Sequence, residues 1–497
     1  MGREKRLPDR SRRKFLKQTA LAAAGCAFAP PLLLTASAVH AAQLELQGVD
    51  IQAAAQAKKL AANKDVTLTI MEPSGSLGNI KPVAERWSAA TGIKIKYVEV
   101  PLEEIDQKMM LEAISKAGSF DLALPASFGL PDLVTSGIVH NLDELSGKYQ
   151  PPGYTSDMLY TVGNYYKGRL YGYGTDGDTY VMFYLKDWLD NPDEKKRFAD
   201  KHGYELQVPK TWEQLDQMMA FFHRPDRGMY GGALFRTRFF IAWEWWVRFH
   251  AKGYYPFGPG MKPQINNDAG VQALAELVAA SKYLYPGARS NGLFENFQAF
   301  GQGGKFCNIG WGGTQKYLNS DKSSVKGELA FGPMPGGVVE GQFLSTPYFN
   351  WGWNYVVSSL SPNKEIAYLF TLYAVSPVES TIAIRDQNGY FDPFRKVHYK
   401  DPWIIRTYGE PFLAVHEASM ANSMPDLYLR GHGEYFDALR ENVQAADVGQ
   451  KTPKQALNDA AKRWDKITDR MNRGSQQVQW DFLKSHYPPA LRNRLKG

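Results

Sequence analysis

Three short segments of the sequence combine tryptophan with glycine, amide or carboxylate side chains. Aromatic faces stack on the C–H surfaces of a sugar, whereas amides and carboxylates hydrogen-bond to its hydroxyl groups. The segments therefore predict a binding site for a sugar-like solute, with Trp243, Trp311, Trp351, Trp353 and Asn354 as candidate contacts. They are Trp243-Glu244-Trp245-Trp246, Gly310-Trp311-Gly312-Gly313 and Asn350-Trp351-Gly352-Trp353-Asn354.

Packing in a core is the alternative for these tryptophans, because aromatic residues fill cores more often than they line clefts. We expect Trp245 and Trp246 to pack inside a helix. For Trp311 both alternatives stay open. Its flanking glycines remove covering side chains and let either a ligand or a backbone segment approach the ring.

A glycine-rich stretch from Tyr171 to Thr179 carries two carboxylates two residues apart, Asp176 and Asp178. As a solvated turn this stretch would be unremarkable. In a cleft, its carboxylates would accept strong hydrogen bonds from hydroxyl groups. A glycosidase needs two carboxylates placed across one scissile bond, which a sequence does not show. We take Tyr173, Asp176 and Asp178 as candidate ligand contacts.

Signatures of catalysis and of cofactor binding are missing from the sequence. It contains no G-x-S-x-G elbow, no H-E-x-x-H, no Walker loop and no dinucleotide motif. Gly303-Gly304-Lys305 lacks the Ser or Thr that follows the lysine of a phosphate loop, and His432-Gly433-Glu434 has no partner ligands at metal spacing. We therefore expect no catalytic residue, no metal and no cofactor.

The first 41 residues have the composition of an export signal. Ser11-Arg12-Arg13-Lys14-Phe15-Leu16-Lys17 match the pattern of the twin-arginine (Tat) pathway, and a small-residue cleavage site follows at Val39-His40-Ala41. Pro30-Pro31 interrupt the apolar run before it reaches the roughly 20 residues of a membrane span. We expect export by the Tat translocase to the periplasm. Lipid anchoring at Cys26 is the alternative.

Composition and charge describe an ordinary globular chain. The length of 497 residues and the 44% hydrophobic content allow two or three domains. The formal net charge of +7 falls to +1 without residues 1–41, so no basic excess remains that would indicate a nucleic-acid partner. Cleavage of the signal would leave Cys307 as the one cysteine, which excludes an intramolecular disulfide.

Strands and helices alternate after a Gln/Ala/Lys-rich leader at 42–64, which we expect to be a loosely held helix. The alternation predicts a parallel-type α/β sheet, in which ligands bind beyond the carboxyl ends of the strands. Glu72 and Ser74, after the first strand, become candidate contacts for this reason. The predicted strands are 66–70, 93–100 and 120–124, and the predicted helices are 80–90, 102–117 and 131–137.

A second α/β block begins near Tyr180. Thr211 is a suitable N-cap for a helix at 212–222. Further helical patterns cover 269–284, 362–375 and 453–471. The sequence shows no internal repeat.

Several segments, in this order, resemble the family 1 extracellular solute-binding proteins of ABC importers, whose best-known members bind maltose. The likeness covers most of residues 65–472. The segments are Thr91-Gly92-Ile93-Lys94-Ile95, Gly168 to Asp178, Pro209-Lys210-Thr211-Trp212-Glu213, Phe300-Gly301-Gln302-Gly303, Ser361-Pro362-Asn363-Lys364-Glu365 and Gln450 to Ala460.

The resemblance implies a type II periplasmic-binding fold, in which two α/β lobes are joined by crossover hinge strands. It places these crossovers near Asp176–Thr179 and Pro347–Trp353. The implied division is a signal at 1–41, a leader helix at 42–64, lobe 1 at 65–177 with about 351–395, lobe 2 at 178–350 with about 396–475, and a C-terminal tail at 476–497.

The resemblance also implies roles for single residues. Asp178 matches an acidic residue that contacts sugar, Trp311 matches a stacking tryptophan of the second lobe, and Tyr435 or Phe436 occupies another stacking position. The chain departs from the family in its Tat signal, in insertions around 225–262 and in its Asn-Trp-Gly-Trp-Asn segment. The identity of the sugar is therefore not carried over.

By resemblance, the function is that of a monomeric, non-enzymatic binding component. It would capture a sugar or sugar-like solute between its lobes by hinge closure and deliver it to the permease subunits of an ABC importer. One alternative is a binding protein for a polyol, a quaternary amine or another non-sugar solute, held in a cation–π cage in the case of an amine. Another is a secreted carbohydrate-active enzyme.

Overall fold

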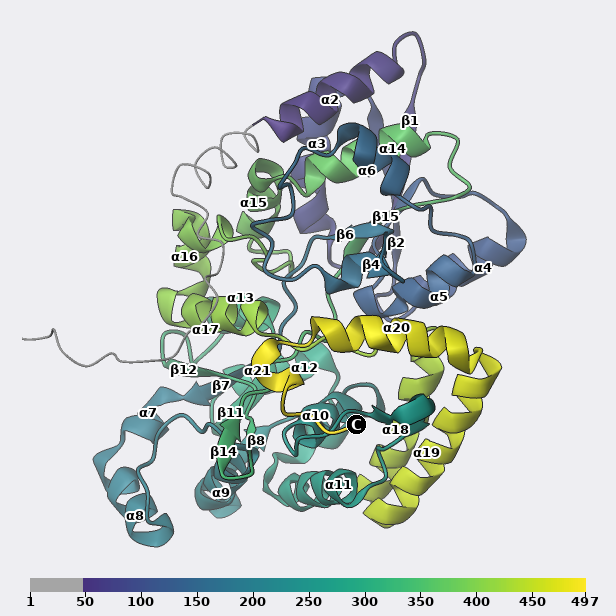
Figure 1. Ribbon diagram of the computed structural model, residues 1–497. Coiled ribbons are helices and arrows are strands. Elements are labelled where there is room, and N and C mark those ends of the chain that lie inside the picture. Colours follow the sequence, from purple (N-terminus) through teal and green to yellow (C-terminus); the bar gives the residue numbers. More distant parts are fainter. Residues whose placement is uncertain (1–47) are drawn as a thin grey trace, which may run out of the picture. The chain divides into compact units, whose positions relative to one another are not determined.

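Two β-sheets organise the part of the chain that the structure, a computed structural model, describes, which is residues 48–497 (Figure 1). The predicted Tat signal, Cys26 and the start of the leader helix lie outside the described residues. The first sheet has five strands in the order β2-β1-β3-β15-β6, and the second has four in the order β12-β7-β11-β8. Helices pack against both sheets, which confirms the prediction of two α/β lobes.

The first lobe is built on β1, which pairs in parallel with β2 and with β3. β15 is antiparallel to β3 and to β6. The prediction of a parallel sheet is therefore right for β1–β3 and wrong for β15 and β6. The strands are β1 (Thr67–Pro73), β2 (Lys94–Val100), β3 (Leu122–Ala123), β4 (Tyr165–Tyr166), β5 (Arg169–Leu170), β6 (Gly172–Gly174) and β15 (Asn354–Val357). The helices are α2 (Val49–Leu60), α3 (Leu77–Thr91), α4 (Ile105–Ser115), α5 (Leu130–Thr135), α6 (Asp143–Tyr149), α14 (Lys364–Ala374) and α15 (Pro377–Arg385).

The second lobe is built on β7, which is antiparallel to β11 and β12, whereas β8 is parallel to β11. The strands are β7 (Val181–Leu185), β8 (Tyr230–Ala233), β9 (Phe257–Gly258), β10 (Lys262–Pro263), β11 (Lys305–Gly310), β12 (Leu329–Pro333), β13 (Gly337–Val339) and β14 (Gln342–Leu344). The helices are α7 (Lys186–Asp190), α8 (Pro192–His202), α9 (Trp212–Phe222), α10 (Arg238–His250), α11 (Asp268–Ala280), α12 (Leu293–Gly301), α13 (Gly312–Leu318), α16 (Pro402–Tyr408), α17 (Glu410–Ala421), α18 (His432–Asp447), α19 (Pro453–Arg470), α20 (Arg473–His486) and α21 (Pro489–Arg492).

Two predictions for helices of this lobe, the start of α9 and the burial of two tryptophans in α10, agree with the structure. Thr211 caps α9, because its Oγ1 accepts a hydrogen bond from the backbone N–H of Gln214 at 3.2 Å while the Gln214 side chain accepts one from the N–H of Thr211. Trp245 and Trp246 lie fully buried in α10, which confirms that they pack in the core.

Three connections between the sheets carry the residues of greatest interest. The first runs from β6 to β7 and the second from β12 to β15, and they meet where Thr179 bridges Phe349 in antiparallel fashion. A third, at 386–401, leads from α15, which packs on α3, to α16, which packs on α13. The sequence analysis named only the first two as crossovers, although its division into lobes implies a third crossing near residue 395. The predicted lobe limits near residues 177, 350 and 395 fall within these three segments.

The leader helix is held firmly, contrary to expectation. α2 packs along α14 of the first lobe, with Val49, Ala53 and Ala57 buried in the contact (Figure 1). The small alanine side chains let the two helices approach closely and exclude water. The prediction of a loosely held helix is therefore wrong for residues 49–60.

The C-terminal segment, set apart as a tail in the sequence analysis, forms most of α20 and all of α21. Trp480 and Leu483 of α20 are buried. The side-chain oxygen of Gln479 accepts a hydrogen bond at 2.9 Å from the backbone N–H of Lys167, in the turn between β4 and β5. α20 thus links the second lobe to the first.

No single helix within residues 48–497 is both long and apolar enough to cross a membrane. α14 and α15 would meet that test only as a pair, and the chain bends by 67° between them.

The packing of α2 on α14 can be tested with Ala57→Glu. This change places a carboxylate in a contact where Ala57 is fully buried, so we expect the free energy of unfolding to fall by about 3 kcal/mol. Urea titration measures it. Gln56→Glu, on the exposed side of the same helix, is the control and should leave stability nearly unchanged. Equal effects of the two changes would show that α2 is not packed.

Candidate functional site

A cleft of about 740 Å³ lies between the two lobes. The first lobe contributes Gly75 and Leu102, and the second contributes side chains of α12 and α13 such as Phe297 and Tyr317. The third connection adds Tyr390. Since both lobes and a connection supply its walls, any change in the angle between the lobes would alter the shape of the cleft.

Three of the predicted tryptophans line this cleft together. Trp311, Trp351 and Trp353 are each at most 5% exposed. The rings of Trp311 and Trp351 lie 5.9 Å apart at 83°, and those of Trp351 and Trp353 lie 5.8 Å apart at 48°. The three rings thus lie against one another at the cleft in different orientations.

Trp311 is held in place from several sides. It precedes α13 directly after β11, and its backbone N–H donates to Thr314 Oγ1 at 3.0 Å. Its indole Nε1–H donates to Asn350 Oδ1 at 2.9 Å, and the Tyr180 ring lies 4.7 Å from its own. Because Asn350 is on the second connection, this hydrogen bond joins the Trp311 ring to that connection.

The glycines beside Trp311 make room for another segment of the chain, which is one of the two alternatives left open by the sequence. A side chain at Gly312 would collide with the Asp392 carboxylate, and one at Gly313 would lie 3.1 Å from Tyr390. Of the two alternatives left open, ligand or backbone, the glycines admit the third connection, which then lies against the start of α13.

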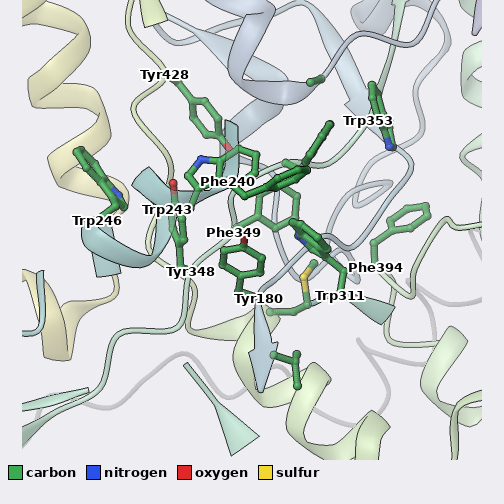
Figure 2. Packing of buried hydrophobic residues seen from close by; sticks show 14 of the residues in the cluster. Tyr180, Phe240, Trp243, Trp246, Trp311, Tyr348, Phe349, Trp353, Phe394 and Tyr428 are labelled. Carbon is green, nitrogen blue, oxygen red and sulfur yellow. The ribbon is translucent and has the colours of Figure 1, made fainter. Parts of the chain in front are cut away.

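Trp243 and its aromatic neighbours form the layer beneath the cleft. Trp243 is fully buried in α10, 5.4 Å from the ring of Trp351 and 6.1 Å from that of Tyr180. Figure 2 shows Trp243 and Tyr180 gathered near Trp311. Trp243 therefore supports the cleft tryptophans rather than lining the cleft itself.

Three carboxylates meet where the connections cross. Asp176, Asp178 and Asp392 each place an oxygen within 4.8 Å of the other two, and Asp178 lines the cleft. The N–H of Asp392 donates to Asp176 Oδ1 at 2.6 Å, and the N–H of Gly352 donates to Asp178 Oδ2 at 3.1 Å. The cluster thus ties all three connections to one another.

Burial governs the protonation of this cluster. Loss of solvent raises the pKa of Asp176 and of Asp178 well above the usual range, and the neighbouring carboxylates raise them further. Burial also raises the pKa of Asp392 to about 7, although Lys316 and the hydroxyl of Tyr408 oppose the shift. The sequence analysis missed Asp392 because it lies 216 residues from Asp176.

Lys316 of α13 is a second residue that the sequence analysis missed. Its ammonium donates to the carbonyl oxygens of Asp386, Gly389 and Phe391 at 2.9, 3.0 and 3.0 Å. Burial lowers the pKa of Lys316 to about 8. The side chain therefore fastens the second lobe to the third connection. Tyr390, also missed, follows Asn388-Gly389, an aromatic–amide pattern that could have identified it.

The two residues predicted to follow the first strand are Glu72, which lies near the end of β1, and Ser74, which directly follows β1. Ser74 is half-buried and adjoins Gly75, which lines the cleft. Glu72 is fully buried, accepts a hydrogen bond from the Ser76 hydroxyl, and has its pKa raised by burial.

Three other predicted residues lie inside the lobes and do not line the cleft. The Tyr173 hydroxyl lies 3.1 Å from that of Tyr368. Asn354 Nδ2 donates to Asn164 Oδ1 at 3.0 Å. The Tyr435 hydroxyl lies 2.7 Å from Thr468 Oγ1. The structure gives each a partner within a core.

Comparison with known proteins places the chain among binding proteins. A family model described as bacterial extracellular solute-binding protein matches residues 74–379. The chain is 23% identical, over 76% of its length and 83% of the other, to a "probable amino-acid ABC transporter periplasmic-binding protein" of Sinorhizobium fredii. It is 27% identical to a "mannitol-binding protein" of Pseudomonas aeruginosa, over 42% of this chain and 46% of that protein.

A solved structure confirms the fold. An ABC transporter solute-binding protein from Agrobacterium radiobacter K84 in complex with ribitol superposes with a TM-score of 0.68 at 20% identity, covering 81% of this chain and 98% of the other. The predicted type II periplasmic-binding fold, with two α/β lobes joined by crossover strands, is therefore correct.

The fastening role of Lys316 predicts a large effect of Lys316→Met. Two buried carbonyl groups and one partly buried carbonyl group would lose their donor, so we expect the free energy of unfolding to fall by about 3 kcal/mol or more. Lys322→Met, at an exposed lysine of the same cleft, should change it by at most about 0.5 kcal/mol. Denaturant unfolding measures both. Equal free energies of unfolding for the two variants would contradict the role assigned to Lys316.

Proposed function

The chain belongs to the bacterial extracellular solute-binding protein family, and on that premise we propose that it captures a sugar or polyol in the cleft between its lobes. It would then deliver this solute to the permease subunits of an ABC importer. The observation that carries the proposal is the junction of Trp311, Trp351 and Trp353 with the Asp178 carboxylate in one cleft.

The chemistry of these groups favours a polyhydroxylated solute. The indole rings offer stacking surfaces for C–H groups, whereas Asp178 accepts hydrogen bonds from hydroxyls. The Nε1–H of Trp351 is buried and has no acceptor among the described residues. A hydroxyl group both donates and accepts, so one solute could serve Trp351 and Asp178 together.

The named ligands of similar proteins support the same class. Mannitol and ribitol are both linear polyols, and they appear in the names of one relative and one solved structure. The name of the Sinorhizobium fredii relative points instead to an amino acid. An amino acid would need a site with one group for its ammonium and another for its carboxylate. The titration that tests the proposal therefore includes a neutral amino acid.

Solute capture would act through closure of the lobes. A solute that touches both lobes binds the closed state better and shifts the equilibrium toward it. The moving bodies would be residues 65–177 with about 351–395, and 178–350 with about 396–475. Gly352, at φ 68°, is the hinge candidate. A side chain at Gly177 would collide with the Pro393 carbonyl, and one at Gly352 would collide with the Phe349 ring, so both glycines also allow close contacts.

Export completes the proposal. The twin arginines Arg12 and Arg13 would direct the folded chain through the Tat translocase to the periplasm, where a monomer meets its permease. We propose binding without turnover, so the solute should leave the protein chemically unchanged.

The proposal is tested by calorimetric titration with mannitol, ribitol, maltose, glycine betaine and a neutral amino acid. We expect a polyol or sugar to bind, and Trp353→Ala to weaken its affinity about tenfold or more, since 1.4 kcal/mol of lost stacking is tenfold. Trp403→Ala, at a tryptophan that is 57% exposed and outside the cleft, is the control. Binding of only betaine or the amino acid would contradict the solute class.

A further inference from the structure

We propose that Asp176, Asp178 and Asp392 bind a hard divalent cation, with Ca²⁺ the best fit, and that this ion holds adjacent hydroxyl groups of the solute. The inference rests on the proposed function for the solute, but the ion site itself is independent of it. It departs from the expectation of no metal, because sequence spacing brought only Asp176 and Asp178 into view.

The geometry of the three carboxylates suits such an ion. One oxygen from each lies within 4.8 Å of the other two. Ca²⁺ sits about 2.3–2.6 Å from its oxygen ligands, so opposite ligands are about 5 Å apart. Three carboxylates at this spacing can therefore contact one ion together, and an all-oxygen donor set selects a hard cation.

Unpartnered oxygens are the second observation that points to a ligand. Asp176 Oδ2 and Asp392 Oδ2 have no hydrogen-bond partner among residues 48–497. Asp176 is 2% exposed and Asp392 is fully buried, so bulk water does not solvate them. A buried carboxylate oxygen without a partner is costly. A cation shared by the three residues would satisfy both oxygens at once.

The neighbouring lysine does not fill this role. Lys316 is the basic side chain that acts on the charges of Asp392 and Asp176. An ammonium has three N–H groups, and Lys316 donates to three backbone carbonyls. The Lys316 ammonium therefore has no N–H left to donate to the unpartnered oxygens. Its single positive charge can balance the negative charge of only one of the three carboxylates.

The second sphere of the site is already ordered. The Tyr408 hydroxyl donates to Asp392 Oδ1 at 3.0 Å, and the N–H of Gly352 donates to Asp178 Oδ2 at 3.1 Å. Groups that orient ligating carboxylates in this way strengthen metal binding. Hydrogen bonds from α16 and from the second connection thus fix two of the carboxylates without an ion.

The ion would be open toward the cleft. Ca²⁺ takes six to eight oxygens, and three carboxylates do not complete that number. Since Asp178 lines the cleft, water or solute can occupy the remaining positions. Two adjacent hydroxyl groups fit neighbouring positions on one ion. The site therefore favours polyols and sugars that carry vicinal hydroxyls.

The first test uses the metal alone. After treatment with EDTA and its removal, we expect CaCl₂ to bind with about one ion per chain and to raise the melting temperature, because it binds only the folded state. Asp176→Asn and Asp392→Asn should each weaken Ca²⁺ binding about tenfold or more. Each keeps the shape of the side chain and relieves repulsion, so both should fold.

The control is Asp321→Asn, an exposed carboxylate at the same cleft, which should bind Ca²⁺ as the unchanged protein does. Absence of Ca²⁺ and Mg²⁺ binding at millimolar concentration would overturn the proposed ion site. The three carboxylates would then be neutralised by protons that they share. Binding that survives Asp176→Asn and Asp392→Asn would overturn it too, because the ion would then lie elsewhere.

The second test separates this inference from the proposed function. We expect EDTA to weaken binding of the solute found by titration, and Ca²⁺ to restore it. Solute binding that is equal with EDTA and with Ca²⁺ would overturn the role of the ion in solute capture while leaving the proposed function intact. Ca²⁺ binding without binding of any solute would contradict the proposed function and support the ion site.

Discussion

The meeting of three buried carboxylates where the chain crosses between the lobes is the constraint on which the rest of the structure depends. Asp176 holds the backbone of Asp392, and Asp178 holds the backbone of Gly352. Charges removed from water in this way must be compensated locally. The residues around Asp392 accommodate its carboxylate. Gly312 has no side chain that would collide with it, and the Tyr408 hydroxyl donates a hydrogen bond to it.

The aromatic cleft is coupled to this cluster through the same segments of chain. Trp351 and Trp353 flank Gly352, whose N–H the Asp178 carboxylate holds. Trp311 precedes Gly312 and is joined to Asn350 by its indole N–H. The cleft tryptophans and the carboxylate cluster thus contact the same connection between the lobes. In the proposed function, a solute bound to the rings would therefore act directly on the segments that join the two lobes.

Sequence reasoning succeeded where the signals were local and failed where position depends on distant contacts. Helix α9 begins where predicted, because its capping box is encoded within four residues. The cleft tryptophans were found through their glycine and amide neighbours. Trp243 and Tyr435 are of the same residue types but are buried inside the second lobe, and only tertiary packing decides between core and cleft. Asp392 was missed because its partners are distant in sequence.

The most direct test of the account is a distance measured across the mouth of the cleft. In the chain without residues 1–41, and so without Cys26, Glu103→Cys and Lys322→Cys place labels at exposed positions on opposite lobes. Cys307 is fully buried and should not react. Double electron–electron resonance should show a shorter distance when the polyol or sugar that binds is saturating. An unchanged distance at saturation would contradict the claim that the solute is captured by closure of the two lobes.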